Sequence, residues 1–234
     1  MIPKRRLIVP LVLTLSLGLG LVPHAAEQIP FDKADLFVQI NATDGDASLH
    51  LALDGEAWKS LKLLAPGGRK ILNVKGKGKL KGLGLTGLTL ESDAPELEEV
   101  PLEEFQAKFP AGTYTFRGVA VEGEKLKGTA TLTHDFPAGP VVLSPEEDAV
   151  VSPGDLVVSW NPVTEPSGIV IVSYQVVVTR EDPYREISID LPADVTSVTI
   201  PAELLESGTQ YSLEVTAQET NGNRTTTELS FATN

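Results

Sequence analysis

The sequence predicts an all-β protein built from two tandem β-sandwich domains. Three observations carry this prediction. Runs of β-branched and aromatic residues, bounded by Pro, Gly, Asn and Asp, follow one another along the chain. Composition and charge change at the Pro- and Gly-rich stretch "HDFPAGPVVLSP", residues 134–145. The chain has no cysteine, so two hydrophobic cores must hold it together without disulfides.

The first residues are typical of a secretory signal peptide. A basic start, Lys4 to Arg6, precedes residues 7–22, which carry no charge. A membrane-spanning helix needs about 20 apolar residues, so a cleaved leader is favoured over a permanent anchor. We therefore expect residues 1–26 to be removed after Ala26. The mature protein would then be secreted or periplasmic, with membrane attachment only through an uncleaved leader.

The second region, residues 138–234, reads as β-strands almost throughout. It holds 15 acidic and 3 basic residues, whereas residues 27–137 hold 17 and 13. An antiparallel sheet that long would leave one face wet, so two packed layers are expected. The predicted strands are "VVLSP", "DLVVSW", "VSYQVVVTR", "REISIDL", "SVTI", "QYSLEVTAQE" and "TTTELSF".

Residues 138–234 resemble the fibronectin type III family, whose fold is an immunoglobulin-like sandwich. The resemblance rests on Trp160 in "VSWNPV", on Tyr174 in "SYQVVV" and on "LLESGTQYSLEVTAQETNGN" around Tyr211. It implies that all three aromatic residues lie in the core. Tyr211 would be a tyrosine corner, with its hydroxyl bonded to a backbone group a few residues upstream. Asn221-Gly222-Asn223 is interpreted as a tight hairpin turn rather than a binding loop.

The first region, residues 27–137, is predicted to be a β-rich, sandwich-like domain of unknown family. "PLEEFQAKF" suits a short helix with Pro101 at its first position. "FPAGTYTFRG" and "GTATLTH" are similar to uncharacterised bacterial secreted proteins. The predicted strands are "DLFVQINA", "ASLHLALD", "AWKSLKLLAP", "RKILNVKG", "LTGLTLES", "GTYTFRGVAVE" and "KLKGTATLTH".

Basic residues are concentrated in one part of this acidic chain, whose net charge is −13. Residues 58–90 contain eight bases and no acid, and residues 91–104 contain seven acids and no base. In "KGKGKLKG" an extended backbone would point every lysine to one face. This pattern indicates a polyanion-binding ribbon for an acidic polysaccharide or another protein, but not for nucleic acid. An edge strand protected by lysine, or a solvated loop beside its acidic complement, is the alternative that we favour. The candidate ligand-binding residues are Arg69, Lys70, Lys75, Lys77, Lys79 and Lys81.

No residue set in the sequence points to catalysis, to a cofactor or to a metal. Without cysteine, and with only His50 and His134 beyond the leader, neither a zinc set nor a cysteine nucleophile is present. "NATDGDAS" is interpreted as an Asx turn rather than a calcium loop. We therefore expect a non-catalytic binding or structural protein. The alternative is a small secreted carbohydrate-active enzyme or enzyme inhibitor with its site in the first domain.

Overall fold

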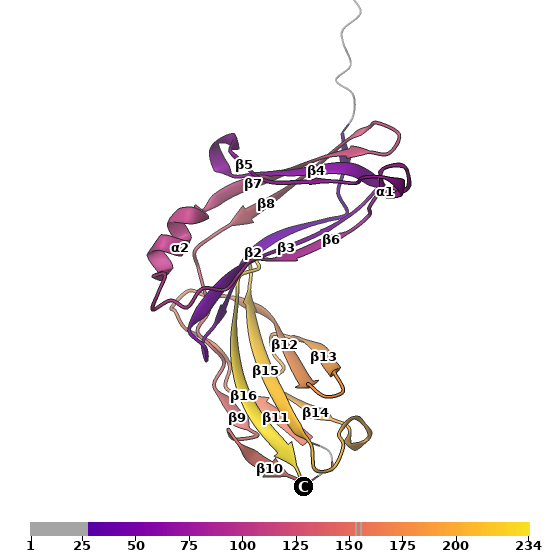
Figure 1. The fold of residues 1–234 in the computed structure, drawn as a ribbon. Helices are drawn as coiled ribbons and strands as arrows, with labels where there is room; N and C mark the ends of the chain where they lie inside the picture. The colour runs from indigo at the N-terminus through magenta and orange to yellow at the C-terminus, as the bar shows by residue number, and fades with distance from the viewer. Residues whose placement is uncertain (1–27, 153, 155) are drawn as a thin grey trace, which may run out of the picture.

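The computed structural model describes residues 28–152, 154 and 156–234. The predicted leader, residues 1–26, lies outside the described residues. The chain forms two β-sandwiches in succession, as the sequence predicts (Figure 1). The first packs around Trp58, Tyr114 and Phe116, and the second around Trp160 and Phe231.

In the first sandwich a five-stranded sheet, in the order β1-β8-β7-β4-β5, covers the strands β2, β3 and β6 of a larger sheet. Alternation along each strand decides which side chains enter the core. In β7, Tyr114 and Phe116 are fully buried while Arg117 points to solvent. The strands are β1 (Ile29–Pro30), β2 (Lys33–Asn41), β3 (Asp46–Asp54), β4 (Trp58–Leu64), β5 (Lys70–Lys75), β6 (Leu88–Glu91), β7 (Gly112–Ala120) and β8 (Lys125–Leu132).

The expected extended ribbon in "KGKGKLKG" is wrong. Strand β5 ends at Lys75, the chain turns at Gly76 to Gly78, and the short helix α1 (Lys79–Leu83) follows. Gly78 has a φ of 55°, which a glycine adopts without strain, so the alternating glycines let the chain leave the strand. Only Lys75 of the four lysines therefore lies on a strand.

Two further short elements complete the first sandwich. A 3-10 turn, η1 (Pro66–Gly68), joins β4 to β5, and helix α2 (Leu102–Lys108) precedes β7. Pro101 is the residue before α2 rather than its first helical residue, one position from the prediction. Phe105 anchors α2 in the core. Neither α-helix in the described part of the chain is long and apolar enough to cross a membrane.

In the second sandwich β13, β12, β15 and β16 form one layer, and β14, β11 and β9 form the other. Strand β10, which the sequence did not predict, pairs in parallel with β16. The strands are β9 (Val142–Ser144), β10 (Ala149–Val151), β11 (Leu156–Trp160), β12 (Ile171–Arg180), β13 (Arg185–Pro192), β14 (Ser197–Ile200), β15 (Gln210–Glu219) and β16 (Arg224–Thr233); the turn η2 (Ala202–Leu204) precedes β15.

The two buried tyrosines of the second core form hydrogen bonds to the backbone through their hydroxyl groups. The Tyr211 hydroxyl oxygen accepts a hydrogen bond from the Glu206 N–H at 2.7 Å, and the Tyr174 hydroxyl accepts one from the Val163 N–H at 2.8 Å. A buried phenol without a partner would be costly, so each bond lets its ring enter the core. Tyr211 thus has the geometry of a tyrosine corner.

The two sandwiches share one sheet. Strand β16 of the second pairs in parallel with β2 of the first. This gives an eight-stranded sheet in which β13-β12-β15-β16 continues as β2-β3-β6, with β10 paired to β16 as the eighth strand. Residues 224–226 face residues 39–41, and the Ala42 N–H donates to the Thr226 carbonyl at 2.8 Å. Because β16 and β2 pair with each other, neither of them is left as an exposed edge strand.

Candidate functional site

The six bases singled out in the sequence lie at one edge of the five-stranded sheet. Lys70 and Lys75 are on its edge strand β5, Arg69 precedes that strand, and the other three lysines lie in the turn and in α1. All six are exposed, and among the described residues none of them forms an ion pair. Within the acidic run 91–104, Glu91 lies 3.8 Å from His50 and Glu104 pairs with Lys108, so this run does not neutralise the lysines through ion pairs.

A second group of bases lies on the outward face of the same sheet. The five described strands of this sheet contain no acidic residue. In the strand register, Lys62 of β4 is directly opposite Arg117 of β7, which is directly opposite Lys127 of β8. These three exposed residues, here called the basic row, span about 10 Å across the sheet. The bases in the strands are Lys59, Lys62, Lys70, Lys75, Arg117, Lys125 and Lys127.

The basic row lines an open hollow of about 630 Å³. Lys125 adds a fourth base to it, and Ser60 and Gln28 add uncharged hydrogen-bonding groups. Beneath it, Leu61, Leu63 and Leu126 point into the core, because side chains alternate between the two faces of a strand. The hollow therefore combines a rigid sheet as its floor with several cationic side chains around it.

The junction of the sandwiches is built around Asn223, which is 1% exposed. Its Oδ1 accepts a hydrogen bond from the Val38 N–H at 3.0 Å, and its Nδ2 donates to the carbonyls of Thr133 and Asp135 at 3.1 and 3.0 Å. Thr225, two residues later, donates to the Pro137 carbonyl at 2.6 Å. The hairpin turn that begins β16 therefore also joins the second sandwich to the first.

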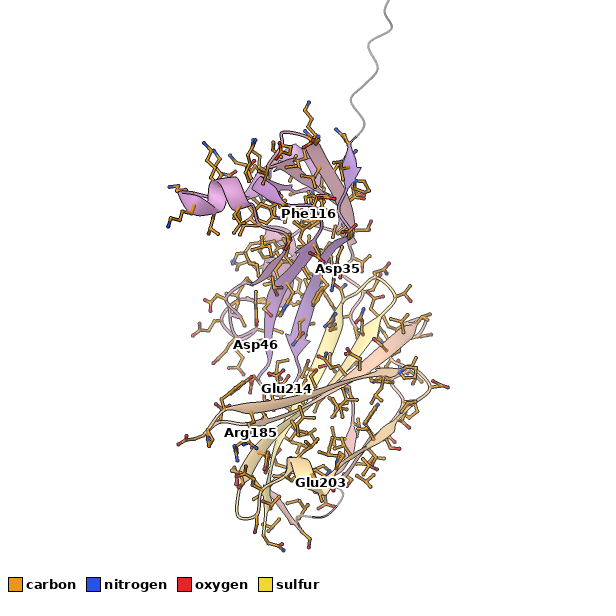
Figure 2. The ribbon with its side chains drawn as sticks, turned by 90° about the vertical axis from the view of Figure 1, so that its right-hand side faces the viewer. Asp35, Asp46, Phe116, Arg185, Glu203 and Glu214 are labelled. Atoms are coloured by element: carbon orange, nitrogen blue, oxygen red, sulfur yellow. The ribbon has the colours of Figure 1, made fainter. Side chains whose placement is uncertain are left out.

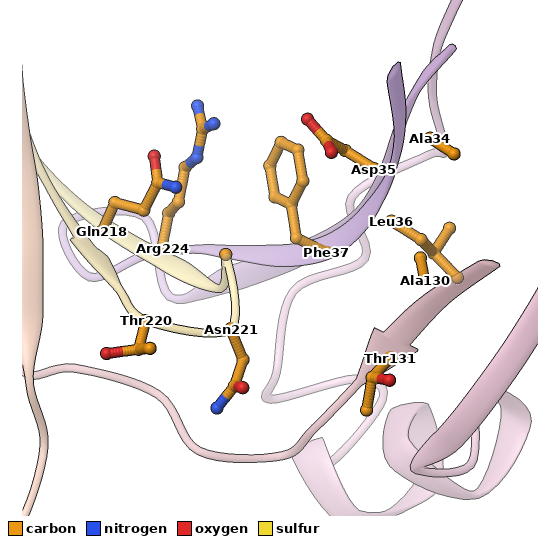
Figure 3. Close-up of a pocket in the computed structure, with 11 residues that line it drawn as sticks. Ala34, Asp35, Leu36, Phe37, Ala130, Thr131, Gln218, Thr220, Asn221 and Arg224 are labelled. Carbon is orange, nitrogen blue, oxygen red and sulfur yellow. The ribbon is translucent and has the colours of Figure 1, made fainter. Parts of the chain in front are cut away.

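Aromatic stacking lies beside this junction. The Arg224 guanidinium sits 4.2 Å from the centre of the Phe37 ring, and Phe37 stacks on His50 with centroids 5.1 Å apart. Figure 3 shows Arg224 and Phe37 side by side, in a hollow of about 260 Å³ that residues of both sandwiches line. Burial lowers the pKa of Arg224, while Asp190 and Asp35 oppose that change.

His50 has polar neighbours, but they do not form a catalytic relay. The Ser48 Oγ lies 2.8 Å from His50 Nε2, and a Glu91 oxygen lies 3.8 Å from the same nitrogen. In a relay the carboxylate orients the imidazole through its other nitrogen. Burial lowers the pKa of His50, and Ser48 is only 5% exposed. Ser48 and His50 thus form a structural contact on β3, and Glu91, on the neighbouring strand β6, is exposed.

The segment "NATDGDAS" forms the turn between β2 and β3. The Asn41 Oδ1 accepts hydrogen bonds from the backbone N–H groups of Thr43 at 3.0 Å and Asp44 at 3.3 Å, which is an Asx turn. Within the part of the chain that the structure describes, no three His, Asp or Glu side chains are grouped to hold a metal ion.

Acidic residues face each other on the outward face of the eight-stranded sheet. Glu214 of β15 is directly opposite Glu228 of β16. Burial raises the pKa of Glu214, and repulsion from Glu228 and Glu186 adds to this. Glu228 accepts a hydrogen bond from the Ser212 hydroxyl at 3.0 Å, and its backbone exchanges hydrogen bonds with the Thr43 hydroxyl. Figure 2 labels Glu214 in the second sandwich and Asp46 in the first.

Sequence reasoning missed the basic row and the role of Asn223. Lys62, Arg117 and Lys127 are far apart in the chain, and only the pairing register brings them together. For Asn223 the sequence indicated a turn, and nothing local showed what the turn would touch. The Ser48–His50 contact could have been predicted from the sequence, because side chains two residues apart on a strand lie on the same face.

Comparisons with known proteins give a family model only for the second sandwich. Residues 145–233 match the family model of the fibronectin type III domain. The FN1–FN3 domains of chicken CNTN1 are similar at 14% identity, with 88% of this chain and 65% of that chain covered and a TM-score of 0.32. A human collagen alpha-1(XX) fn3 domain gives 25% identity over 42% of this chain and 82% of that one, with a TM-score of 0.31.

A two-domain segment of chicken tenascin gives 15% identity, with 85% of this chain and 98% of that chain covered and a TM-score of 0.28. A search of curated proteins found no match. The assignment therefore rests on the family model and on the sandwich with its buried Trp160, Tyr174 and Tyr211. Residues 145–233 are a fibronectin type III domain.

Proposed function

We propose that the chain is exported, with residues 1–26 as its signal peptide, and acts outside the cytoplasm as a non-catalytic binding or structural protein. Its domains would be residues 27–137 and 138–234. Two separate hydrophobic clusters support this division, because one draws on residues 29–136 and the other on residues 142–231. The basic, then uncharged, start of the chain supports export.

The observation that carries the proposal is the shared sheet. Two domains joined only by a linker would be expected to move relative to each other. Here β16 pairs with β2, and Asn223 bonds to three backbone groups of the first domain. The fibronectin type III domain thus holds the first domain in a fixed orientation and keeps its outward sheet face available to a partner. Such an arrangement suits presentation of a binding surface.

The competing function is a small secreted carbohydrate-active enzyme or an enzyme inhibitor with its site in the first domain. Within the described part of the chain, the closest approach to a catalytic set is Ser48 with His50 and Glu91. Ser48 and Glu91 both lie near the same nitrogen of His50, and the serine is buried. This geometry leaves the imidazole without a carboxylate at its other nitrogen, and burial keeps the serine away from substrate.

Two measurements test the proposal. N-terminal sequencing of the protein from culture supernatant or periplasm should give a chain that begins near Glu27, and an intact Met1 on a membrane-bound product would contradict export. Incubation with acidic and neutral polysaccharides should release no new reducing ends. Release that the Ser48→Ala variant lacks would establish the competing enzyme function.

A further inference from the structure

The basic row is unfavourable in a sheet unless an oppositely charged group compensates for its repulsion. Like charges directly opposite each other on neighbouring strands repel and destabilise the pairing. Lys62, Arg117 and Lys127 form two such contacts in succession, Lys62 with Arg117 and Arg117 with Lys127. Among the residues that the structure describes, none of the three forms an ion pair. The described residues therefore leave the positive charge of the row without an anionic partner.

Protection of a sheet edge does not account for the row. Lysine protects edges when it lies on an edge strand, as Lys70 and Lys75 do on β5. Strands β4 and β7, which carry Lys62 and Arg117, are paired on both sides. Solubility does not account for it either, because the net charge of −13 already keeps copies apart.

We propose that the basic row and Lys125 form a binding site for an acidic polysaccharide, with the polymer lying in the hollow of about 630 Å³ on the five-stranded sheet. This names the partner class of the binding protein proposed above and rests on that proposal.

A polymer fits the spacing of these bases better than a single anion does. The row extends about 10 Å across three strands, and Lys125 and Lys127 are about 7 Å apart along β8. A single carboxylate offers two oxygens to four bases, whereas a chain that carries an anionic group on successive sugars offers several groups along the row. Each exposed pair is weak, so affinity must come from several simultaneous contacts.

The chemistry of the hollow also favours a sugar polymer over nucleic acid. The described residues that line it include no aromatic side chain on which a base could stack, whereas single-stranded nucleic acid is bound on such side chains. Ser60 and Gln28 supply uncharged groups that can bond to sugar hydroxyls. Arg117, at the centre of the row, presents a planar fork that matches a carboxylate or a sulfate.

The test compares two variants that lose the same charge. The row variant carries Lys62→Gln, Arg117→Gln and Lys127→Gln. The control variant carries Lys77→Gln, Lys79→Gln and Lys81→Gln, in the exposed segment between β5 and the end of α1. Binding of the mature chain to polygalacturonate, dextran sulfate and neutral dextran is measured by calorimetry at low and physiological salt.

The parent should bind both anionic polymers but not neutral dextran, and more weakly as salt rises, because exposed charges are screened beyond about 8 Å at physiological ionic strength. The row variant should lose about tenfold or more in affinity, and the control variant about threefold or less. Binding of only one of the two polymers would identify carboxylate or sulfate as the anion. Melting temperatures verify folding, and the single change Arg117→Gln, with a smaller loss, replaces the row variant if the latter does not fold.

Equal losses in the two variants would overturn the site, because net charge alone would then govern binding. Unchanged binding by the row variant would overturn it as well, as would a parent that binds phosphatidylglycerol vesicles but neither polymer. The proposed function fails separately, through release of reducing ends. A missing polymer interaction thus refutes the site alone, and cleavage of a bound polymer refutes the non-catalytic role alone.

Discussion

The outward faces of the eight-stranded and five-stranded sheets both carry like charges opposite each other, acidic on the first and basic on the second. The two sets of charges differ in their partners inside the protein. On the eight-stranded sheet, Glu214 opposes Glu228, but the Glu228 carboxylate accepts hydrogen bonds from the Ser212 hydroxyl at 3.0 Å and from the Asn41 amide of the first domain at 3.5 Å. The carboxylate therefore takes part in the contact between the domains. On the five-stranded sheet, the basic row is exposed and no described residue neutralises it through an ion pair. Like charges on neighbouring strands can thus be part of a structural contact or be available to a ligand. Charges with hydrogen-bond partners inside the protein are of the first kind, and charges without them are of the second.

The largest effect is expected where the eight-stranded sheet crosses between the domains. Asn223→Ala leaves the Val38 N–H and the carbonyls of Thr133 and Asp135 without this partner in a buried place. We expect it to cost about 2 to 4 kcal/mol in the free energy of unfolding, measured by urea denaturation. Asn221→Ala, at an exposed position of the same turn, is the control and should cost about 0.5 kcal/mol or less. Equal effects would mean that the junction adds no stability.

A smaller effect is expected inside the second domain. Tyr211→Phe removes the acceptor of the Glu206 N–H and should lower the free energy of unfolding by about 1 to 3 kcal/mol. Tyr184→Phe is the matched control, because Tyr184 is 62% exposed and its hydroxyl donates to the exposed Glu186. A midpoint unchanged in both variants would show that the corner hydroxyl bond does not stabilise the domain.

The smallest of the three effects concerns the acidic face. The folded-state pKa of Glu214 is raised, mainly by burial and also by Glu228 and Glu186, so its charged form costs stability above that pKa. Glu214→Gln should therefore be more stable than the parent at pH 7. The advantage should disappear as the pH falls below about 4, where the carboxyl is protonated in both folded and unfolded chains. A variant less stable than the parent at pH 7 would show that this carboxylate makes a favourable contact.

The strands of this protein were predictable from the sequence because their signals are local. Strands β14 and β15 have the predicted bounds, since turn residues flank runs of alternating side chains. Strand β10 was missed because it has only three residues and is held by parallel pairing with β16, far away in the chain. Helix α1 was missed because alternating lysines resemble a strand when the freedom of the intervening glycines is not considered.

The candidate site was less predictable, because it depends on pairing between distant segments. The sequence correctly indicated that bases gather in the first domain, but only part of the cluster, residues 58–90, is continuous in the chain. Arg117, Lys125 and Lys127 come later, beyond the acidic run 91–104, and join Lys62 only because β7 lies between β4 and β8. Which bases share a face is fixed by register, and register is set by packing of the whole domain.

The most direct test of the contrast between the two faces is to locate a bound acidic polymer on the full mature chain. Backbone amide NMR shifts are followed while a short polygalacturonate oligomer is added at low salt. The account predicts that the largest changes fall on β4, β7 and β8 around Lys62, Arg117 and Lys127, while β12, β15 and β16 remain unaffected. Changes centred on residues 76–83 instead, or spread evenly over all exposed bases, would contradict it.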